Sequence, residues 1–226
     1  MFFNRLGLVL ALIMFYWIGR KHHLKLSQIF ALFVVVPMAY SLLFAIRYVD
    51  DVIIGDPDLK AGAKLIIVLI PLAMLFGPRI RISALESSDI IVPIFISARA
   101  TFVIGCIFGG CCHGYPWAKG IYSCVTGYRC IPVPLLDCLF GYTLVIVLLV
   151  WAHGYDYRTE GKVAAIGTIL YGISFYCSDL LTDNHKLIGA SSFDGIYAFI
   201  IVIMGLCILH LSIEKRAESA ILFRTT

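Results

Sequence analysis

Seven apolar stretches divide the chain and constrain its fold more than any other feature. Hydrophobic residues make up 61% of the sequence and charged residues 14%, a balance that no soluble domain of this size could bury. A straight helical span needs about 20 apolar residues, and apolar or aromatic flanks extend most of the shorter stretches toward that length. We predict an all-α membrane protein, a bundle of about seven transmembrane helices in a single multi-pass domain over residues 1–226. The stretches are residues 6–19, 29–46, 61–77, 90–108, 135–151, 163–181 and 196–213.

The distribution of basic residues predicts how the bundle is oriented. The first stretch is followed by Arg20 and Lys21 rather than by a small-residue cleavage site, so we interpret it as a retained helix. Loops after the first, third and fifth stretches and the C-terminal tail carry more lysine and arginine than the other loops, which indicates their cytoplasmic side. The N-terminus and the longest loop, residues 109–134, are then expected on the outer face of the plasma membrane. The net charge of +4 is spread through short loops, so no nucleic-acid partner is expected.

Arg99 lies near the middle of the fourth stretch, where an arginine costs roughly 2.5–3.5 kcal/mol to insert. Two interpretations are open: an ion pair inside the bundle, or a site that binds an anion. A guanidinium group stays charged and can bind two phosphate oxygens at once. The obvious anion in a membrane is the phosphate of a lipid headgroup, which makes Arg99 a candidate phosphate-binding residue.

Other polar residues are expected close to the same helix face. Arg99, Val103 and Cys106 are spaced i, i+4 and i+7 and should therefore share a face that leads to the outer loop. Asp137 begins the fifth stretch and Asp179 lies near the outer end of the sixth. Both carboxylates should lie near the outer surface, where each could form a cap or a salt bridge within the bundle or serve a site.

Five of the eight cysteines gather around the outer loop. Cys124 and Cys130 enclose a short segment and form a candidate disulfide, which the outer face permits, although sequence alone does not fix the pairing. Plain packing is the alternative. We expect no metal or other cofactor, because the cysteines contain no Cys-x-x-Cys pair, even with His113 beside them. The five are Cys106, Cys111, Cys112, Cys124 and Cys130.

Residues 104–114, Ile-Gly-Cys-Ile-Phe-Gly-Gly-Cys-Cys-His-Gly, resemble the cysteine-containing form of the signature of prolipoprotein diacylglyceryl transferases. The likeness continues in order from Asp89 to Asp183 and agrees with the predicted topology. The other segments that resemble the family are Asp89 with Pro93 before the signature, Pro132-Val-Pro-Leu-Leu-Asp137 after it, and Leu170-Tyr-Gly172 followed by Asp179.

The resemblance implies transfer of a diacylglyceryl group from a phospholipid, phosphatidylglycerol in the family, to the cysteine thiol of a lipoprotein precursor. The expected partners are a phosphatidylglycerol-like phospholipid and the precursor peptide. Such a reaction needs a cation for the phosphate and a base for the thiol proton. We expect Arg99 to bind the phosphate and His113 or Asp179 to handle the proton. The residues expected to contact substrate are Cys106, Gly114, Asp137 and Tyr171.

The chain departs from the family pattern at several positions. Val103 and Phe175 stand where the family has arginines, Cys106 replaces an asparagine, Asp137 replaces a glutamate, and the His-Gly-Gly element before the third stretch is absent. Arg99 lies one helical turn from Val103 and could reach the same place, and His113 could replace the missing histidine. Two functions therefore stay open: a diacylglyceryl transferase, or a catalytically degenerate or thiol-redox membrane protein on the same scaffold.

Overall fold

The computed structural model describes residues 2–53, 61–109, 114–122, 127–157, 159–182 and 191–225. Seven α-helices in these ranges coincide with the seven apolar stretches, so the helical prediction is confirmed there. The elements are α1 (Phe2–Lys21), α2 (Leu26–Ile53), α3 (Ala61–Phe76), η1 (Gly77–Ile80), α4 (Ala84–Gly109), β1 (Pro116–Tyr122), β2 (Arg129–Cys130), α5 (Val133–Gly154), α6 (Lys162–Leu181) and α8 (Ser191–Thr225).

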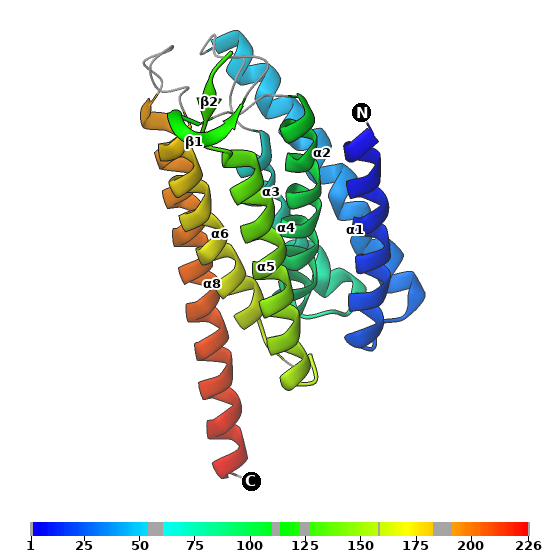
Figure 1. The fold of residues 1–226 in the computed structure, drawn as a ribbon. Helices are drawn as coiled ribbons and strands as arrows, with labels where there is room; N and C mark the ends of the chain where they lie inside the picture. The colour runs from blue at the N-terminus through cyan, green and yellow to red at the C-terminus, as the bar shows by residue number, and fades with distance from the viewer. Residues whose placement is uncertain are drawn as a thin grey trace.

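Four helices in the described part of the chain are long and apolar enough to cross a membrane. They are Ala84–Phe108, Val133–Gly154, Lys162–Leu181 and Gly195–Ala217, and two shorter apolar helices span Leu26–Ala39 and Leu65–Ile80. The chain termini lie at opposite ends of the bundle, with the β1–β2 ribbon at the same end as the N-terminus (Figure 1). The count of seven spans and the side that faces the cytoplasm stay predictions.

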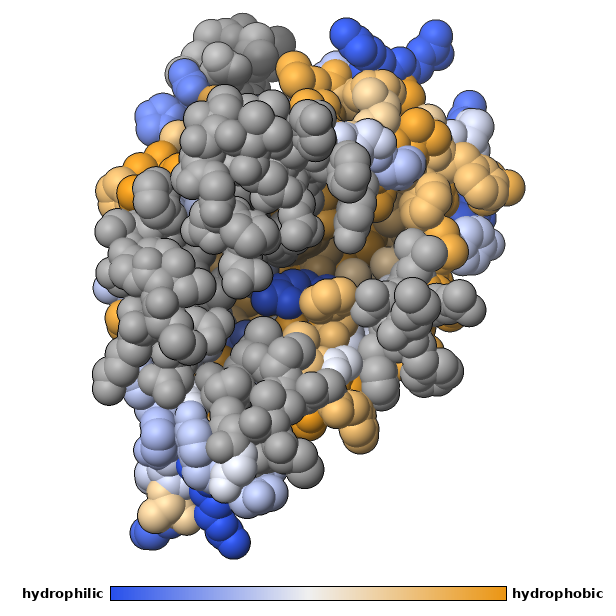
Figure 2. All heavy atoms as spheres, turned by 90° about the horizontal axis from the view of Figure 1, so that it is seen from above, coloured by the Kyte–Doolittle hydropathy of each residue, from blue (hydrophilic) through white to orange (hydrophobic). Residues whose placement is uncertain are grey.

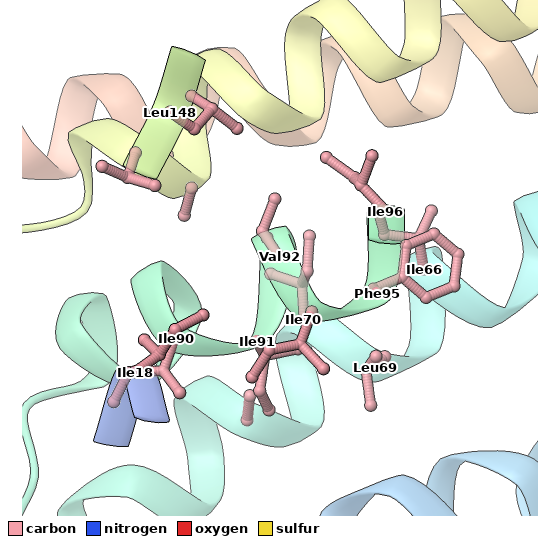
Figure 3. Packing of buried hydrophobic residues seen from close by; sticks show 14 of the residues in the cluster. Ile18, Ile66, Leu69, Ile70, Ile90, Ile91, Val92, Phe95, Ile96 and Leu148 are labelled. Carbon is pink, nitrogen blue, oxygen red and sulfur yellow. The ribbon is translucent and has the colours of Figure 1, made fainter. Parts of the chain in front are cut away.

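Helix α4 is the centre of the bundle. It contacts α1, α3, α5 and α6, and every residue in 87–97 is buried. A helix that is apolar on all sides is stable only when neighbours cover it. Figure 3 shows the α4 side chains Ile90 and Ile91 beside Ile18 of α1 and Ile70 of α3, and all four belong to one buried cluster. This packing fixes the helix that carries Arg99.

A buried carboxylate joins the start of α4 to the start of α6. Asp89 accepts hydrogen bonds from the Thr159 hydroxyl at 2.5 Å and from the backbone N–H groups of Gly161 and Ala164, both at 2.7 Å. The first N–H groups of a helix have no partner within the helix, and a carboxylate there is favourable. Gly161 has a φ of 93°, and a Cβ atom at this position would lie 2.9 Å from the Leu85 side chain. Asp89 therefore caps α6 from α4 and sets how the two helices meet.

The long loop between α4 and α5 contains a small antiparallel ribbon that the sequence did not predict. Ile121 pairs with Cys130, and Tyr122 pairs with Arg129. Aromatic and β-branched residues of β1 favour an extended backbone. Gly120 permits the close approach of the strands, because a Cβ atom there would lie 2.1 Å from the Cys130 carbonyl oxygen.

The last helix is longer than its apolar stretch predicted. Its 35 residues correspond to about 52 Å at 1.5 Å per residue, and Figure 1 shows α8 extending past the other helices at the C-terminal end. Helix formation does not require apolar residues, and the glutamate, lysine, arginine and alanine residues after Ile213 are good helix formers. The apolar stretch therefore underestimates the length of the helix.

Candidate functional site

A small pocket lies between α4, α5 and α6, the three helices that Asp89 and close interhelical packing hold together. Its enclosed volume is about 30 Å³, room for about two water molecules. The pocket can therefore hold a small polar group, but not a whole lipid. The lining residues are Ile96, Arg99, Ala100 and Val103 of α4, Asp137, Phe140 and Gly141 of α5, and Tyr171, Ser174 and Phe175 of α6.

Close approach of α4 and α5 shapes one wall of this pocket. A Cβ atom at Gly141 would lie 2.9 Å from the Ala100 Cβ, so these two small residues let the helix backbones come together. Seen from the ribbon end, hydrophilic atoms lie in a hollow near the centre of the molecule (Figure 2). Polar side chains, Arg99 and Asp137 among them, line the pocket between the three helices.

The guanidinium group of Arg99 is the cationic centre of the pocket. It interacts electrostatically with Tyr171, Asp137 and Cys106, and its carbon atom lies 5.8 Å from the centre of the Phe102 ring. Arg99 as a whole is partly buried, and it lines the pocket. Asp137 compensates its charge, which reduces the cost of keeping an arginine in the apolar part of the bundle.

Tyr171 is held rigidly and brings a hydroxyl group to the same place. Its side chain is 8% exposed, with ring centres 5.6 Å from Phe95 and 6.5 Å from Phe175. The hydroxyl group lies close enough to Arg99 to interact with it, but the contact lacks the geometry of a well-formed hydrogen bond. A buried hydroxyl without a good partner costs about 1–3 kcal/mol. The group is thus ready to donate to a ligand in the pocket.

Asp137 is fixed by a neighbouring serine of α6. The Ser178 hydroxyl donates a hydrogen bond to the Asp137 carboxylate. The Ser178 carbonyl oxygen in turn accepts one from the Thr182 hydroxyl at 2.8 Å. The carboxylate therefore connects α5 to the last turns of α6, and it stays directed toward Arg99. An arginine, a carboxylate and a tyrosine hydroxyl together can bind a small charged group and stabilise charge that develops on it.

Comparison with known families identifies the scaffold. The sequence profile of the prolipoprotein diacylglyceryl transferases matches residues 61–211. The chain belongs to the prolipoprotein diacylglyceryl transferase family. A comparison with curated proteins found no match for the chain. The matched region begins at the first residue of α3 and contains all three pocket helices. The resemblance read from the sequence is confirmed, and at the family level the match supports a membrane transferase-like function in lipoprotein biosynthesis.

The pocket brings together three of the residues that the sequence analysis selected, Arg99, Asp137 and Tyr171. Cys106 lies near enough to interact electrostatically with Arg99, in agreement with the shared helix face that the spacing predicts. Val103 and Phe175, the two positions that the resemblance matches to arginines of the family, both line the pocket. Three of the departures from the family pattern, at Val103, Asp137 and Phe175, therefore line this pocket.

Phe140, Ser174 and Ser178 were not among the site residues predicted from the sequence. Ser174, Phe175 and Ser178 follow Tyr171 at i+3, i+4 and i+7, so helical periodicity could have placed them on the Tyr171 face. Phe140 follows Asp137 by three residues on α5, so the same periodicity could have placed it on the Asp137 face.

Two other predicted residues of the transferase site lie outside the described pocket lining. Asp179 is 5% exposed and lies two helical turns beyond Tyr171, near the end of α6. Gly114 is buried, and its N–H donates to the Ile131 carbonyl oxygen at 3.0 Å. It also forms a β-bridge with Thr182 at the end of α6. The structure thus gives Gly114 a role in joining the loop between α4 and α5 to the end of α6, and its contact with substrate stays a prediction.

The remaining predictions concern residues near or beyond the described ranges. His113 and Cys124 lie outside the described residues. The Cys130 thiol lies 3.7 Å from the Ile121 carbonyl oxygen as a hydrogen-bond donor, and the candidate disulfide between Cys124 and Cys130 stays a prediction. Within the described ranges, no three His, Cys, Asp or Glu side chains are close enough to hold a metal ion.

Replacing Gly114 by alanine is expected to destabilise the ribbon end of the bundle. The new Cβ atom would lie 2.7 Å from the Leu181 carbonyl oxygen and 2.9 Å from that of Ile131, and backbone atoms cannot move away as a flexible side chain can. We expect a loss of about 1–3 kcal/mol of stability, typical of overpacking, measured as a lower midpoint of thermal unfolding in detergent. Gly154→Ala is the matched control, because its Cβ atom meets nothing within 4 Å. Equal midpoints for both variants would contradict the prediction.

Proposed function

We propose that the protein transfers a diacylglyceryl group from a phospholipid to the cysteine thiol of a lipoprotein precursor, and that Arg99 binds the lipid phosphate. The observation that carries the proposal is the pocket between α4, α5 and α6, where Arg99 faces the buried Tyr171 hydroxyl. A guanidinium group suits a phosphate because it can donate two parallel hydrogen bonds to the oxygens. The family match over residues 61–211 supports the reaction type.

The negative charge on the lipid phosphate increases during the reaction, so the site must supply positive charge or hydrogen-bond donors to stabilise it. The thiolate sulfur attacks the glycerol carbon that carries the phosphate, so a sulfur–carbon bond forms and the carbon–oxygen bond breaks. The electron pair of that bond leaves with the phosphate oxygen and converts a singly charged diester into a monoester. Arg99 stabilises this developing charge, and the Tyr171 hydroxyl donates to a second oxygen. Preorganised donors of this kind are each worth about 10²–10³ in rate.

The proton of the thiol needs an acceptor, because the thiolate is the nucleophile. We propose His113 or Asp179 as the base, with the proton passing finally to the phosphate of the leaving group. The precursor thiol approaches from the outer face of the plasma membrane, where the loop between α4 and α5 is predicted to lie. Cys106, Asp137 and Gly114 are proposed to position the substrates around this end of the site.

Reconstitution of the purified protein tests the proposal. The protein is placed in liposomes that contain phosphatidylglycerol, phosphatidylethanolamine and phosphatidylcholine, together with a synthetic peptide that carries a lipoprotein-type cysteine. We expect the mass of the peptide to increase by one diacylglyceryl group. A peptide with serine in place of cysteine is the control and should stay unmodified. No mass increase with any of the three lipids would overturn the proposed function.

A further inference from the structure

The described residues of the β1–β2 ribbon bury very little of their own surface. Of the seven residues of β1 only Gly120 is buried, and Cys130 is the buried residue of β2. The side chains of Trp117 and Tyr122 are large and open, with 49% and 60% of each residue exposed. A two-stranded ribbon without a packed face is only marginally stable in water. A second surface that covers these rings would stabilise the ribbon.

The ribbon lies directly beyond the ends of two helices that form the pocket (Figure 1). β2 ends at Cys130, and α5 begins three residues later at Val133. Gly114, just before β1, forms a β-bridge with Thr182, the residue that follows α6. These two connections hold the ribbon at the level where α5 and α6 end.

The lipid-facing surface of α5 begins very close to this level. The helix is long and apolar enough to cross a membrane, and Leu136 and Leu139 in its first two turns are 44% and 58% exposed. They lie about 4.5 and 9 Å along the helix from Val133, at 1.5 Å per residue. The headgroup layer extends about 5–8 Å beyond the hydrocarbon core on each side. With these leucines against acyl chains, the ribbon lies within the headgroup layer.

The exposed residues of β1 suit that layer chemically. Tryptophan and tyrosine are enriched at membrane–water interfaces, because each combines an apolar ring with a polar group. Lys119 is exposed between the two rings in the sequence, and a lysine can place its apolar stem among lipids while its ammonium group reaches the phosphates. Exposed apolar surface of this kind marks an interaction site.

The shape of β1 favours a lipid surface over an extended peptide as the partner. A peptide that adds to a sheet needs a regular strand edge with evenly presented backbone groups. The pairing of β1 with β2 is irregular between Pro116 and Ile121, where both residues pair with Cys130. Such a bulge bends the strand and interrupts its edge.

We propose that the β1–β2 ribbon binds the membrane surface, with the rings of Trp117 and Tyr122 in the headgroup layer and Lys119 at the lipid phosphates. The partner is a phospholipid surface, and burial of the rings requires no particular headgroup. The ribbon is thereby a membrane-binding element attached to α5 and α6. This surface is separate from the lining of the pocket, so the proposal does not depend on the transfer reaction.

Tryptophan fluorescence tests the position of the ribbon. Trp17 and Trp151 are replaced by phenylalanine, and Trp117 is measured in phosphatidylcholine vesicles whose acyl chains carry bromine either near the headgroup or near the chain end. We expect the shallow bromine to quench Trp117 at least about twice as strongly as the deep one, as suits a ring at headgroup level. Quenching mainly by the deep bromine, or by acrylamide from the water without quenching by bromine, would overturn the proposal. Shielding of Trp117 from acrylamide only after addition of a lipoprotein-type peptide would overturn it too, and would assign the ribbon to the peptide.

Hydrogen exchange tests the same surface in protein that keeps its other tryptophans. In phosphatidylcholine nanodiscs we expect the backbone amides of the ribbon to exchange about tenfold faster in Trp117→Ser and in Tyr122→Ser than in the wild type, equivalent to 1.4 kcal/mol. Tyr155→Ser is the matched control, because Tyr155 is 58% exposed and directly follows α5 at the opposite end of the bundle. Its ribbon should exchange as in the wild type. Wild-type exchange in both ribbon variants would contradict the proposal.

Discussion

Replacing Arg99 by alanine is expected to lower the rate of diacylglyceryl transfer at least about 100-fold, the loss typical of one essential charge-stabilising group. The guanidinium group is the cation among the described residues that line the pocket, and the phosphate gains negative charge as its bond to glycerol breaks. Without Arg99, the Asp137 carboxylate would repel that charge. The rate is measured per folded protein in liposomes, with the fold monitored by thermal unfolding.

Two further variants define what Arg99 supplies. Arg99→Lys keeps the positive charge but loses the planar pair of donors, so its rate should lie between those of the wild type and Arg99→Ala. Arg129→Ala is the matched control, because Arg129 is an exposed arginine on β2 at the ribbon end of the bundle. A wild-type rate in folded Arg99→Ala would contradict a role for Arg99 in the reaction.

The helices could be predicted from the sequence because each contains a long apolar stretch. Such a stretch is stable in a membrane only when its backbone hydrogen bonds are satisfied within a helix. Hydropathy carries no information about helical residues outside the bilayer, which explains the missed continuation of α8 beyond Ile213. The β1–β2 ribbon was missed for a related reason, since its pairing depends on Gly120 and Cys130 meeting across a loop.

The candidate site could be predicted in part. Arg99 is unusual at its depth in a membrane segment, Asp137 is a carboxylate at the start of an apolar stretch, and Tyr171 was selected through the resemblance to the family. The hydrogen bond between Ser178 and Asp137 joins residues 41 positions apart, and it depends on how α5 packs against α6. Such a contact has no local pattern in the sequence, so only the three-dimensional structure identifies it.

Asp89 is a clearer example of a contact that the sequence cannot predict, because its partners are far away along the chain. In the sequence, Asp89 belongs to a segment that resembles the family, and no pattern there predicts its hydrogen-bond partners. Its hydrogen-bond partners Thr159, Gly161 and Ala164 are 70 to 75 positions away. Gly161 has a positive φ and packs against Leu85. The need for glycine at this position is explained by the close contact between α4 and the start of α6, which the sequence does not show.

Replacing Asp89 by alanine is expected to destabilise the protein by about 3 kcal/mol or more. The substitution leaves the Thr159 hydroxyl and the N–H groups of Gly161 and Ala164 without their acceptor, and each buried unsatisfied group costs about 1–3 kcal/mol. The midpoint of thermal unfolding in detergent measures the loss. Glu86→Ala is the matched control, because this nearby acid on α4 is partly exposed and lies 3.4 Å from His22 in an ion pair. A partly exposed acid with this contact should cost less to remove than a buried carboxylate that accepts three hydrogen bonds.

The same substitution should also affect the pocket well below the unfolding temperature. Asp89 holds the first turn of α6 against α4, and further along these two helices Tyr171 faces Arg99 across the pocket. If this attachment sets their relative position, folded Asp89→Ala should retain less phospholipid and transfer diacylglyceryl more slowly than folded Glu86→Ala. Asp89→Asn should recover little, because an amide has one accepting oxygen whereas the three donors are divided between both carboxylate oxygens. Wild-type retention and rate in folded Asp89→Ala would show that the cap stabilises the bundle without positioning the site.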